Sequence, residues 1–186
     1  MIFNRSDNIR DIIIINPTIH NDERGYFFES YKDFSFKEFG LEVIFVQDNQ
    51  VKSKKGALRG LHYQLIKPQG KLVWVSQGSV LDVAVDLRKN SPTFKQYFSI
   101  ILDDIHHRRV FIPPGFAHGY YVLSSEAIFQ YKCTNYYYPE DEYGIAWNDP
   151  EIGIKWPDGK KIISNKDLCF SPLAELDQDK LPTMLA

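Results

Sequence analysis

The sequence has little cysteine, no long apolar run and no excess of basic residues. Its two cysteines, Cys133 and Cys169, form neither a disulfide framework nor a CxxC metal site. No apolar run approaches the roughly 18 residues of a membrane span, and charges interrupt the first residues too early for a secretory signal. Lys and Arg number 22 against 24 Asp and Glu, which does not favour nonspecific nucleic-acid binding. We therefore expect a cytoplasmic protein that binds neither nucleic acid nor membrane.

Linkers and repeats are also missing from the 186 residues. The length predicts a single domain over 1–186, with a core over about 5–170 and a polar, loosely held C-terminal tail over 171–186. Aromatic residues, in contrast, are plentiful, with 11 Tyr, 13 Phe and 3 Trp. Aromatic and β-branched side chains favour strands, so the composition indicates a β-rich core.

Short β-type segments separated by turn residues recur along the chain. The clearest are Lys71–Ser76, Val80–Leu87, Tyr97–Leu102 and Ala127–Cys133. This spacing predicts an all-β sandwich or barrel with few helices, not alternating β and α units. Other predictions for the N-terminal part are a strand over Tyr26–Tyr31, a short helix over Phe34–Phe39 ended by Gly40, and a strand over Val43–Val46. The next segment, Gln47–Gln50, is either a polar turn, which is the commoner case, or a set of donors and acceptors at a site.

The segment Leu58–Gln64 places Arg59, Gly60 and His62 close together within a predicted strand. Histidine suits proton transfer near neutral pH, and arginine suits bidentate binding of phosphate. In a regular strand Arg59 and His62 would point to opposite faces. Both can reach one pocket only if the strand bulges at Gly60 or if Arg59 still lies in the preceding loop.

A series of further segments, in one collinear order over about residues 5 to 170, resembles the dTDP-4-dehydrorhamnose 3,5-epimerase family. The matching segments are Asp22–Gly25 with Glu29, Gln47–Asn49, Leu58–His62, Gly70–Leu72, Pro113–Gly119, Tyr131–Thr134, Tyr137 with Glu142, Trp147–Pro150, and Ser164 with Lys166–Asp167. The resemblance implies a cupin-like jelly-roll β-barrel that forms a homodimer and uses no cofactor. It also implies an enzyme of dTDP-rhamnose biosynthesis, which converts dTDP-4-keto-6-deoxyglucose to dTDP-4-keto-L-rhamnose by epimerisation at C3 and C5 for cell-surface polysaccharides.

The same resemblance assigns roles to individual residues. His62 is the expected base, Asp167 orients its ring, Tyr131 is the acid on the opposite side of the sugar, and Lys71 stabilises the enolate. The residues implied to bind substrate are Arg24, Glu29, Gln47, Asp48, Asn49, Arg59, Lys71, His118, Tyr137, Glu142 and Lys166. Among them, Tyr137 is expected to stack on thymine and Arg59 to bind phosphate. An N-terminal segment reaches into the neighbouring subunit in this family, so Arg24 and Glu29 are candidates for the partner's site.

These roles fit the chemistry of epimerisation. Loss of a proton next to a ketone requires a cation or donor at the enolate oxygen, and inversion requires an acid and a base across the ring. Two alternatives within the class are an epimerase that inverts one carbon only and an isomerase of another nucleotide-linked keto-sugar. A sugar-binding module without catalysis is disfavoured by the trio His62, Tyr131 and Asp167.

A metal-dependent cupin is the other competing class. Cupin metal sites usually contain a His-x-His pair, but Gln64 stands where the second histidine would be. Two lone histidines, His62 and His118, do not supply the three ligands of a catalytic zinc site. We therefore expect no metal, and we expect His106 and His107 to lie in a solvated loop.

Overall fold

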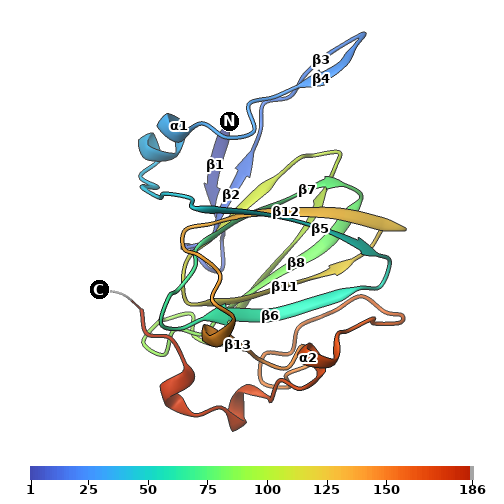
Figure 1. Ribbon diagram of the computed structural model, residues 1–186. Coiled ribbons are helices and arrows are strands. Elements are labelled where there is room, and N and C mark those ends of the chain that lie inside the picture. The colour runs from blue at the N-terminus through green and yellow to red at the C-terminus, as the bar shows by residue number, and fades with distance from the viewer. Residues whose placement is uncertain (185–186) are drawn as a thin grey trace.

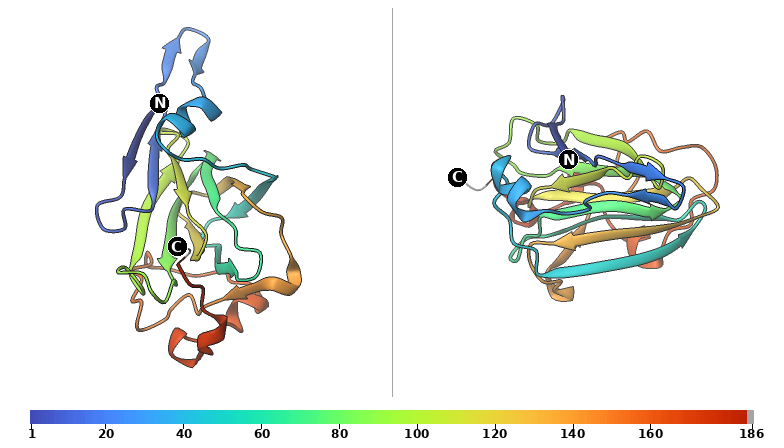
Figure 2. Two further views of the ribbon diagram at one scale, coloured as in Figure 1. Left: turned by 90° about the vertical axis from the view of Figure 1, so that its left-hand side faces the viewer. Right: turned by 90° about the horizontal axis from the view of Figure 1, so that it is seen from above.

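The computed structural model describes residues 1–184 and consists mainly of two antiparallel sheets that lie face to face (Figures 1 and 2). The first sheet has six strands, in the spatial order β1 (Ile2–Arg5), β2 (Ile13–Asn16), β10 (Arg109–Ile112), β7 (Lys71–Gln77), β12 (Glu126–Cys133) and β5 (Gln47–Lys54). The second has five strands, in the order β13 (Glu142–Gly144), β6 (Leu58–Gln64), β11 (Phe116–Val122), β8 (Ser79–Asp86) and β9 (Tyr97–Asp103). This confirms the predicted all-β, double-sheet class.

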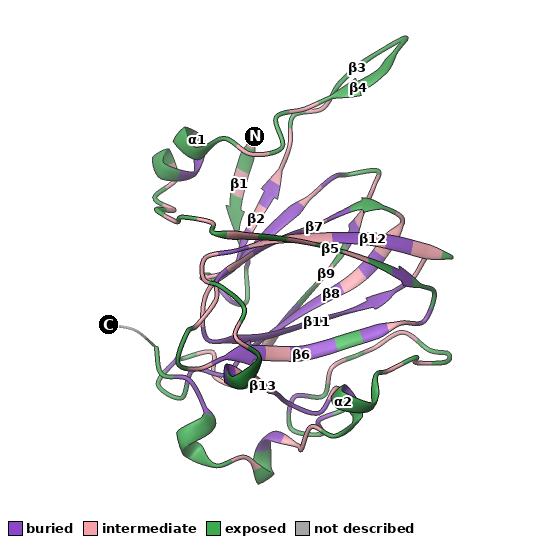
Figure 3. Cartoon of the chain, viewed as in Figure 1, coloured by how far each residue is buried: buried purple, intermediate pink, exposed green. Residues whose placement is uncertain are grey.

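The main hydrophobic core fills the space between the two sheets. Val73, Val75 and Phe129 point inward from the six-stranded sheet, and Ala84 and Val122 come from the five-stranded sheet. All five are at most 1% exposed. Figure 3 shows β8 and β11 buried over most of their length, as expected for strands in the centre of a sheet with both faces covered.

A short helix, α1 (Asp33–Glu38), covers the outer face of the six-stranded sheet. Its Phe36 is 1% exposed and packs in a cluster with Leu72 and Phe111. Gly40 follows the helix with φ of 86°, and the N–H of Leu41 donates to the carbonyl of Phe36. This left-handed glycine ends the helix as the sequence predicted. No helix among residues 1–184 is long and apolar enough to span a membrane.

A β-hairpin formed by β3 (His20–Asp22) and β4 (Gly25–Phe27) projects from one end of the molecule (Figure 1). Its tip is exposed, but the rings of Tyr26 and Phe28 lie 4.7 and 4.9 Å from the ring of His107. His107 is therefore only 7% exposed, and its predicted solvation was wrong because these aromatic rings cover it. The predicted strand over Tyr26–Tyr31 is limited to Gly25–Phe27.

The structure also corrects the prediction around residue 47. Gln47–Gln50 is not a polar turn, since it begins β5, and Val43–Val46 is not a strand. Every residue of β5 pairs with β12, so hydrogen bonding to a neighbouring strand overrides the low β-propensity of amide and acidic side chains. As a result, alternate residues of this polar run face the interior of the barrel.

The remaining helices lie in the C-terminal part of the chain. They are α2 (Asn165–Leu168) and three 3₁₀ turns at Pro139–Asp141, Leu173–Glu175 and Gln178–Lys180. The tail was predicted to be loosely held, but Leu173 and Leu181 are each 3% exposed and pack against the five-stranded sheet. The hydroxyl of Tyr63 also donates to the carbonyl of Lys180 at 2.9 Å. The prediction was wrong because a few apolar residues in a polar segment bury efficiently; residues 185–186 lie outside the described part.

Candidate active site

A polar cavity opens between the inner faces of the two sheets. One part, with a volume of about 360 Å³, is lined by His62 from β6, Lys71 from β7 and Tyr131 from β12. An adjoining part of about 250 Å³ shares these three residues and extends toward Arg59 and His118. The two sheets therefore bring together the predicted base, acid and cation, which are far apart in the sequence.

His62 is held by a carboxylate from the far end of the chain. Its Nε2 lies 2.8 Å from Oδ1 of Asp167, whose Oδ2 accepts a hydrogen bond from the N–H of Gly60 at 3.3 Å. Burial alone would raise the pKa of Asp167, but the hydrogen bond and charge of His62 and the N–H of Gly60 outweigh it and lower the pKa. Asp167 thus stays ionised, fixes the ring and leaves Nδ1 as the nitrogen that faces the cavity.

The backbone at Gly60 allows Arg59 and His62 to reach the same cavity. Gly60 has φ of 108°, and the pairing of β6 with β11 shifts register between His118 and Tyr120. A Cβ at Gly60 would lie 2.6 Å from both the Cα of Gly119 and the carbonyl oxygen of His118. Glycine is required here for both its conformation and its size. The predicted irregularity at Gly60 is therefore confirmed.

Lys71 and Tyr131 face His62 from the opposite sheet. Lys71 pairs with Cys133, and Tyr131 pairs with Val73, so the alternation of both strands places all four side chains on the inner face. Desolvation is the main cause that raises the pKa of Tyr131 to about 12, which keeps its hydroxyl protonated. Desolvation also lowers the pKa of Lys71, although the negative charges of Glu142 and Asp82 oppose this effect.

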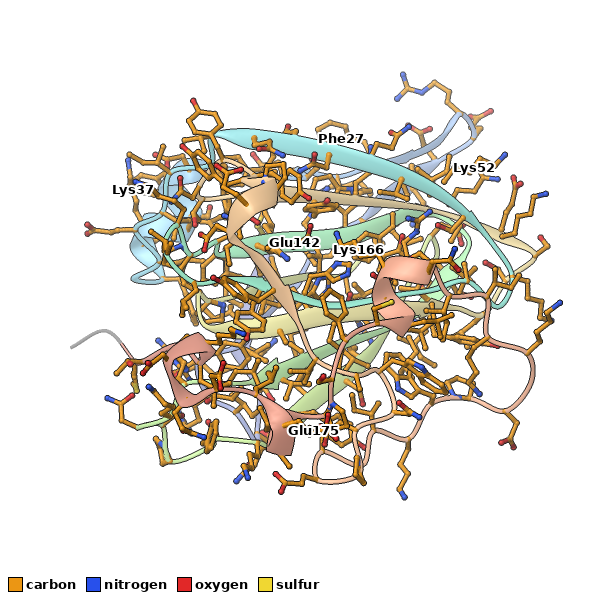
Figure 4. The ribbon with its side chains drawn as sticks, turned by 60° about the horizontal axis from the view of Figure 1, so that its bottom comes forward. Phe27, Lys37, Lys52, Glu142, Lys166 and Glu175 are labelled. Carbon is orange, nitrogen blue, oxygen red and sulfur yellow. The ribbon has the colours of Figure 1, made fainter. Side chains whose placement is uncertain are left out.

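Tyr137, Glu142 and Lys166 meet at the mouth of the cavity. Oε2 of Glu142 accepts from the hydroxyl of Tyr137 and from Nζ of Lys166, both at 2.5 Å. Figure 4 shows Glu142 and Lys166 side by side. Burial would raise the pKa of Glu142, but these two hydrogen bonds and nearby His62 lower it, whereas the bond to Glu142 raises the pKa of Tyr137 to about 12. The ring of Tyr137, 46% exposed, is free to receive a planar ligand.

Gln47 and Asn49 line the cavity, but the side chain of Asp48 does not. Nε2 of Gln47 donates to Oδ1 of Asn49 at 3.1 Å, and Oε1 of Gln47 accepts from the N–H of Tyr137 at 2.9 Å. Asp48 lies between them in β5 and points outward, where its carboxylate pairs with Lys132 at 2.7 Å. The period of two along the strand separates Asp48 from its neighbours.

Arg59 and His118 occupy the adjoining part of the cavity. Nε of Arg59 donates to the hydroxyl of Ser53 at 3.0 Å, and no carboxylate within residues 1–184 pairs with its guanidinium. Nε2 of His118 lies 2.7 Å from Oδ2 of Asp82, whose side chain is fully buried. Sequence reasoning missed Asp82. Its place within the otherwise apolar segment Val80–Leu87 was the available signal, because a buried carboxylate needs a partner.

Like the side chain of Asp48, the predicted residues Arg24 and Glu29 do not lie at this cavity. Arg24, on the projecting hairpin, is 89% exposed in its side chain and pairs with Asp22 at 2.6 Å. Glu29 follows the hairpin and lies 3.4 Å from Nζ of Lys32. Neither residue lines either part of the cavity.

The donor set of the cavity does not resemble a metal site. Within the described chain, no group of three or more His, Cys, Asp or Glu side chains is arranged to hold an ion. Each of the two histidines is bonded to a different carboxylate, through Nε2 in both cases.

Comparison with known proteins gives a consistent result. Residues 6–175 match the family model described as dTDP-4-dehydrorhamnose 3,5-epimerase. The dTDP-4-dehydrorhamnose 3,5-epimerase of Methanothermobacter thermautotrophicus is 54% identical over 166 residues, which are 88% of this chain and 90% of that protein.

Two solved structures are also informative. The dTDP-6-deoxy-D-glucose-3,5-epimerase of Legionella pneumophila, in complex with dTDP-4-keto-L-rhamnose, is 47% identical with a TM-score of 0.95, covering 99% of this chain and 98% of that one. ChmJ, a 3'-monoepimerase from Streptomyces bikiniensis in complex with dTDP-quinovose, is 33% identical with a TM-score of 0.91, covering 97% and 93%.

Proposed function

Because this chain belongs to the dTDP-4-dehydrorhamnose 3,5-epimerase family, we propose that His62 and Tyr131 carry out its reaction from opposite sides of the sugar. The chain is an isomerase that epimerises dTDP-4-keto-6-deoxyglucose at C3 and C5 to dTDP-4-keto-L-rhamnose. The observation that carries the mechanism is the placement of an imidazole and a protonated phenol on opposing sheets across one cavity.

In the proposed cycle, Nδ1 of His62 takes the proton from C3, and the electrons of the C–H bond move to the C4 oxygen to form an enolate. Lys71 donates a hydrogen bond to this oxygen and stabilises its charge. The hydroxyl of Tyr131 then gives its proton to the opposite face of C3, which inverts the carbon. The Tyr131 phenolate regains a proton from solvent and His62 loses its proton to solvent, and the same sequence at C5 completes the reaction.

Nucleotide binding follows from the rest of the cavity in this proposal. The ring of Tyr137 stacks on the thymine, with Gln47, Asn49 and Glu142 beside it. Arg59 and Lys166 supply positive charge for the two phosphates from the adjoining part of the cavity. Asp48 is proposed to act at most through its backbone, since its side chain faces outward.

Solvent deuterium distinguishes this function from inversion of a single carbon, which is the activity of the 3'-monoepimerase ChmJ. The protein is incubated with dTDP-4-keto-6-deoxyglucose in D₂O, and the product is analysed by NMR. Deuterium is expected at both C3 and C5, together with the L-configured product. Label at one carbon alone would contradict double epimerisation.

A homodimer would explain why Arg24 and Glu29 lie away from the cavity of their own subunit. The hairpin that carries Arg24 projects away from the barrel (Figure 1). Its Tyr26 is 57% exposed and its Phe27 68% exposed. Apolar side chains of this size are unfavourable in water, and a second copy of the chain would bury them. We propose that the hairpin completes the partner's cavity, where Arg24 binds phosphate.

Subunit complementation tests this arrangement. Arg24→Ala and His62→Ala proteins, each nearly inactive, are unfolded together and refolded as a mixture. A heterodimer would contain one intact site, so about a quarter of the wild-type activity should return. Light scattering gives the mass of the wild-type protein, and a monomer or the absence of complementation would contradict the proposal.

A further inference from the structure

A second imidazole–carboxylate pair, His118 with Asp82, lies beside the first. The two residues come from the adjacent strands β11 and β8, and the side chains are 8% and 0% exposed. Their closest atoms, Nε2 and Oδ2, are 2.7 Å apart. His118 lines the same part of the cavity as Lys71 and Tyr131. The mechanism proposed above leaves this pair without a task.

Asp82 is poorly satisfied for a buried acid. Its Oδ1 is buried and has no hydrogen-bond partner within the described chain, and His118 supplies the one side-chain hydrogen bond to Oδ2. Lys71 lines the same part of the cavity, but a buried carboxylate is stabilised most by a positive charge at hydrogen-bond distance. A proton on His118 provides this charge at hydrogen-bond distance. The ring of Phe129, 5.9 Å away and nearly parallel, holds the imidazole in position.

The protonated ring has a second donor. Since Nε2–H is directed to Asp82, Nδ1–H is available, and Nδ1 has no partner among residues 1–184. We propose that Asp82 is a positioning residue that keeps His118 as an imidazolium, whose Nδ1–H donates a hydrogen bond to the C4 oxygen of the sugar as that oxygen becomes an enolate. The proton stays on Nδ1 throughout, so no bond to His118 forms or breaks. This inference rests on the proposed epimerase mechanism and adds a second donor to Lys71.

The charge of Asp82 also supports Lys71. Desolvation lowers the pKa of Lys71, and the negative field of Asp82 is one of the effects that oppose this change. The cavity that Lys71 lines has further titratable side chains, and Asp82 from β8 also acts on the pKa of Lys71. They are Arg59, His62 and Tyr63 from β6, His118 and Tyr120 from β11, Tyr131 and Cys133 from β12, Tyr137, Glu142 from β13, and Lys166 and Asp167 from α2. Removing the charge at Asp82 should therefore allow Lys71 to lose its proton at lower pH.

Asp82→Asn tests the role in catalysis, because asparagine has the same shape and no charge. We expect kcat to fall about 10²- to 10³-fold, the usual effect of losing one donor to an oxyanion. The affinity for dTDP, which lacks the sugar, should stay within about twofold. The matched control is Asp86→Asn on the same strand. Asp86 is also fully buried, but its carboxylate binds Arg88, Ser91 and Thr93 outside the cavity, so kcat of the folded control should be unchanged.

Two readouts separate this role from a purely structural one. The alkaline fall in kcat/KM should move to lower pH in Asp82→Asn and stay in place in Asp86→Asn. Nitrogen-15 NMR of the wild-type protein without substrate should show both ring nitrogens of His118 protonated at about pH 7. A neutral His118 ring, or a folded Asp82→Asn protein with wild-type kcat, would overturn the proposal.

The NMR measurement shows whether the His118 ring is charged even if Asp82→Asn does not fold. It needs neither turnover nor substrate, so its result is independent of the epimerase mechanism. A failure of that mechanism would instead be seen as normal turnover in the His62 or Tyr131 variants.

Discussion

The two walls of the cavity differ in how their titratable groups are paired. On the five-stranded sheet, His62 is bonded to Asp167 and His118 to Asp82, at 2.8 and 2.7 Å. On the six-stranded sheet, neither Nζ of Lys71 nor the hydroxyl of Tyr131 has a hydrogen-bond or ion-pair partner within residues 1–184. Burial is the main cause that lowers the pKa of Lys71 and raises that of Tyr131.

This difference has a physical consequence. A histidine bonded to a carboxylate has a fixed orientation, so His62 can accept a proton, and His118 can donate a hydrogen bond, without moving. A desolvated lysine or tyrosine instead gains a partner when a ligand oxygen arrives, so its interaction with that oxygen is strong. We infer that the two histidines of the five-stranded sheet are oriented before the substrate binds, and that Lys71 and Tyr131 of the other sheet find their partners in the sugar.

His62→Ala should lower turnover more than any other change, because it removes the base from the five-stranded sheet. Turnover should fall about 10⁴-fold, the upper end for a positioned acid or base. Thermal unfolding and dTDP binding should stay near wild type, since His62 is partly exposed and is not part of either core cluster around it. Activity within tenfold of wild type would show that another group removes the proton.

Tyr131→Phe should lower the rate of epimerisation about 10³-fold and leave the rate of proton removal unchanged. The enolate would then regain its proton mainly from His62, on the face it left. In D₂O, the substrate should therefore take up deuterium with retained configuration faster than product appears. NMR of the recovered substrate measures this ratio. Equal rates of exchange and epimerisation would assign the acid to a different residue.

Lys71→Arg tests the effect of desolvation on the six-stranded sheet. We expect turnover to fall about 10²-fold at neutral pH. In the wild type, Lys71 has a lowered pKa, so its charge is lost as pH rises, and kcat/KM should fall below the pH at which an exposed lysine titrates. Arginine remains charged in this range, so the variant should lose that alkaline fall. An unchanged pH profile would mean that Lys71 does not set it.

Tyr137→Phe should give the smallest effect, because it keeps the ring and removes only the bond to Glu142 at the mouth of the cavity. A hydrogen bond of this kind contributes about 1 kcal/mol, so KM should rise less than tenfold. Tyr137→Ala, which also removes the stacking surface, is the comparison. If both substitutions raise KM equally, the proposed stacking on thymine is wrong.

The strands were predictable because their side-chain pattern is local. Lys71–Ser76 and Ala127–Cys133 lie within one or two residues of the observed β7 and β12. Gly60 was also predictable, since a conflict between strand alternation and a shared pocket can be seen in seven residues. In contrast, β5 escaped prediction because its amides and acids have low β-propensity, and only pairing with β12 makes the segment a strand.

The contacts of the site were less accessible from the sequence. His62 and Asp167 are 105 positions apart, and no local pattern shows that they touch. The pairing of Asp82 with His118 depends on the order of strands in the sheet, and the outward direction of Asp48 depends on where β5 begins. The tail packs because Leu173 and Leu181 find apolar surface that the rest of the chain supplies.

The β-rich class, the end of α1 before Gly40 and the family of the protein all follow from the kinds of residue and their order along the chain. In contrast, the three-dimensional arrangement of the strands sets which carboxylate holds each histidine and which of Gln47, Asp48 and Asn49 face the cavity. The same arrangement places Arg24 and Glu29 away from the cavity. These outcomes arise from pairing between strands distant in sequence, which sets the direction and burial of each side chain.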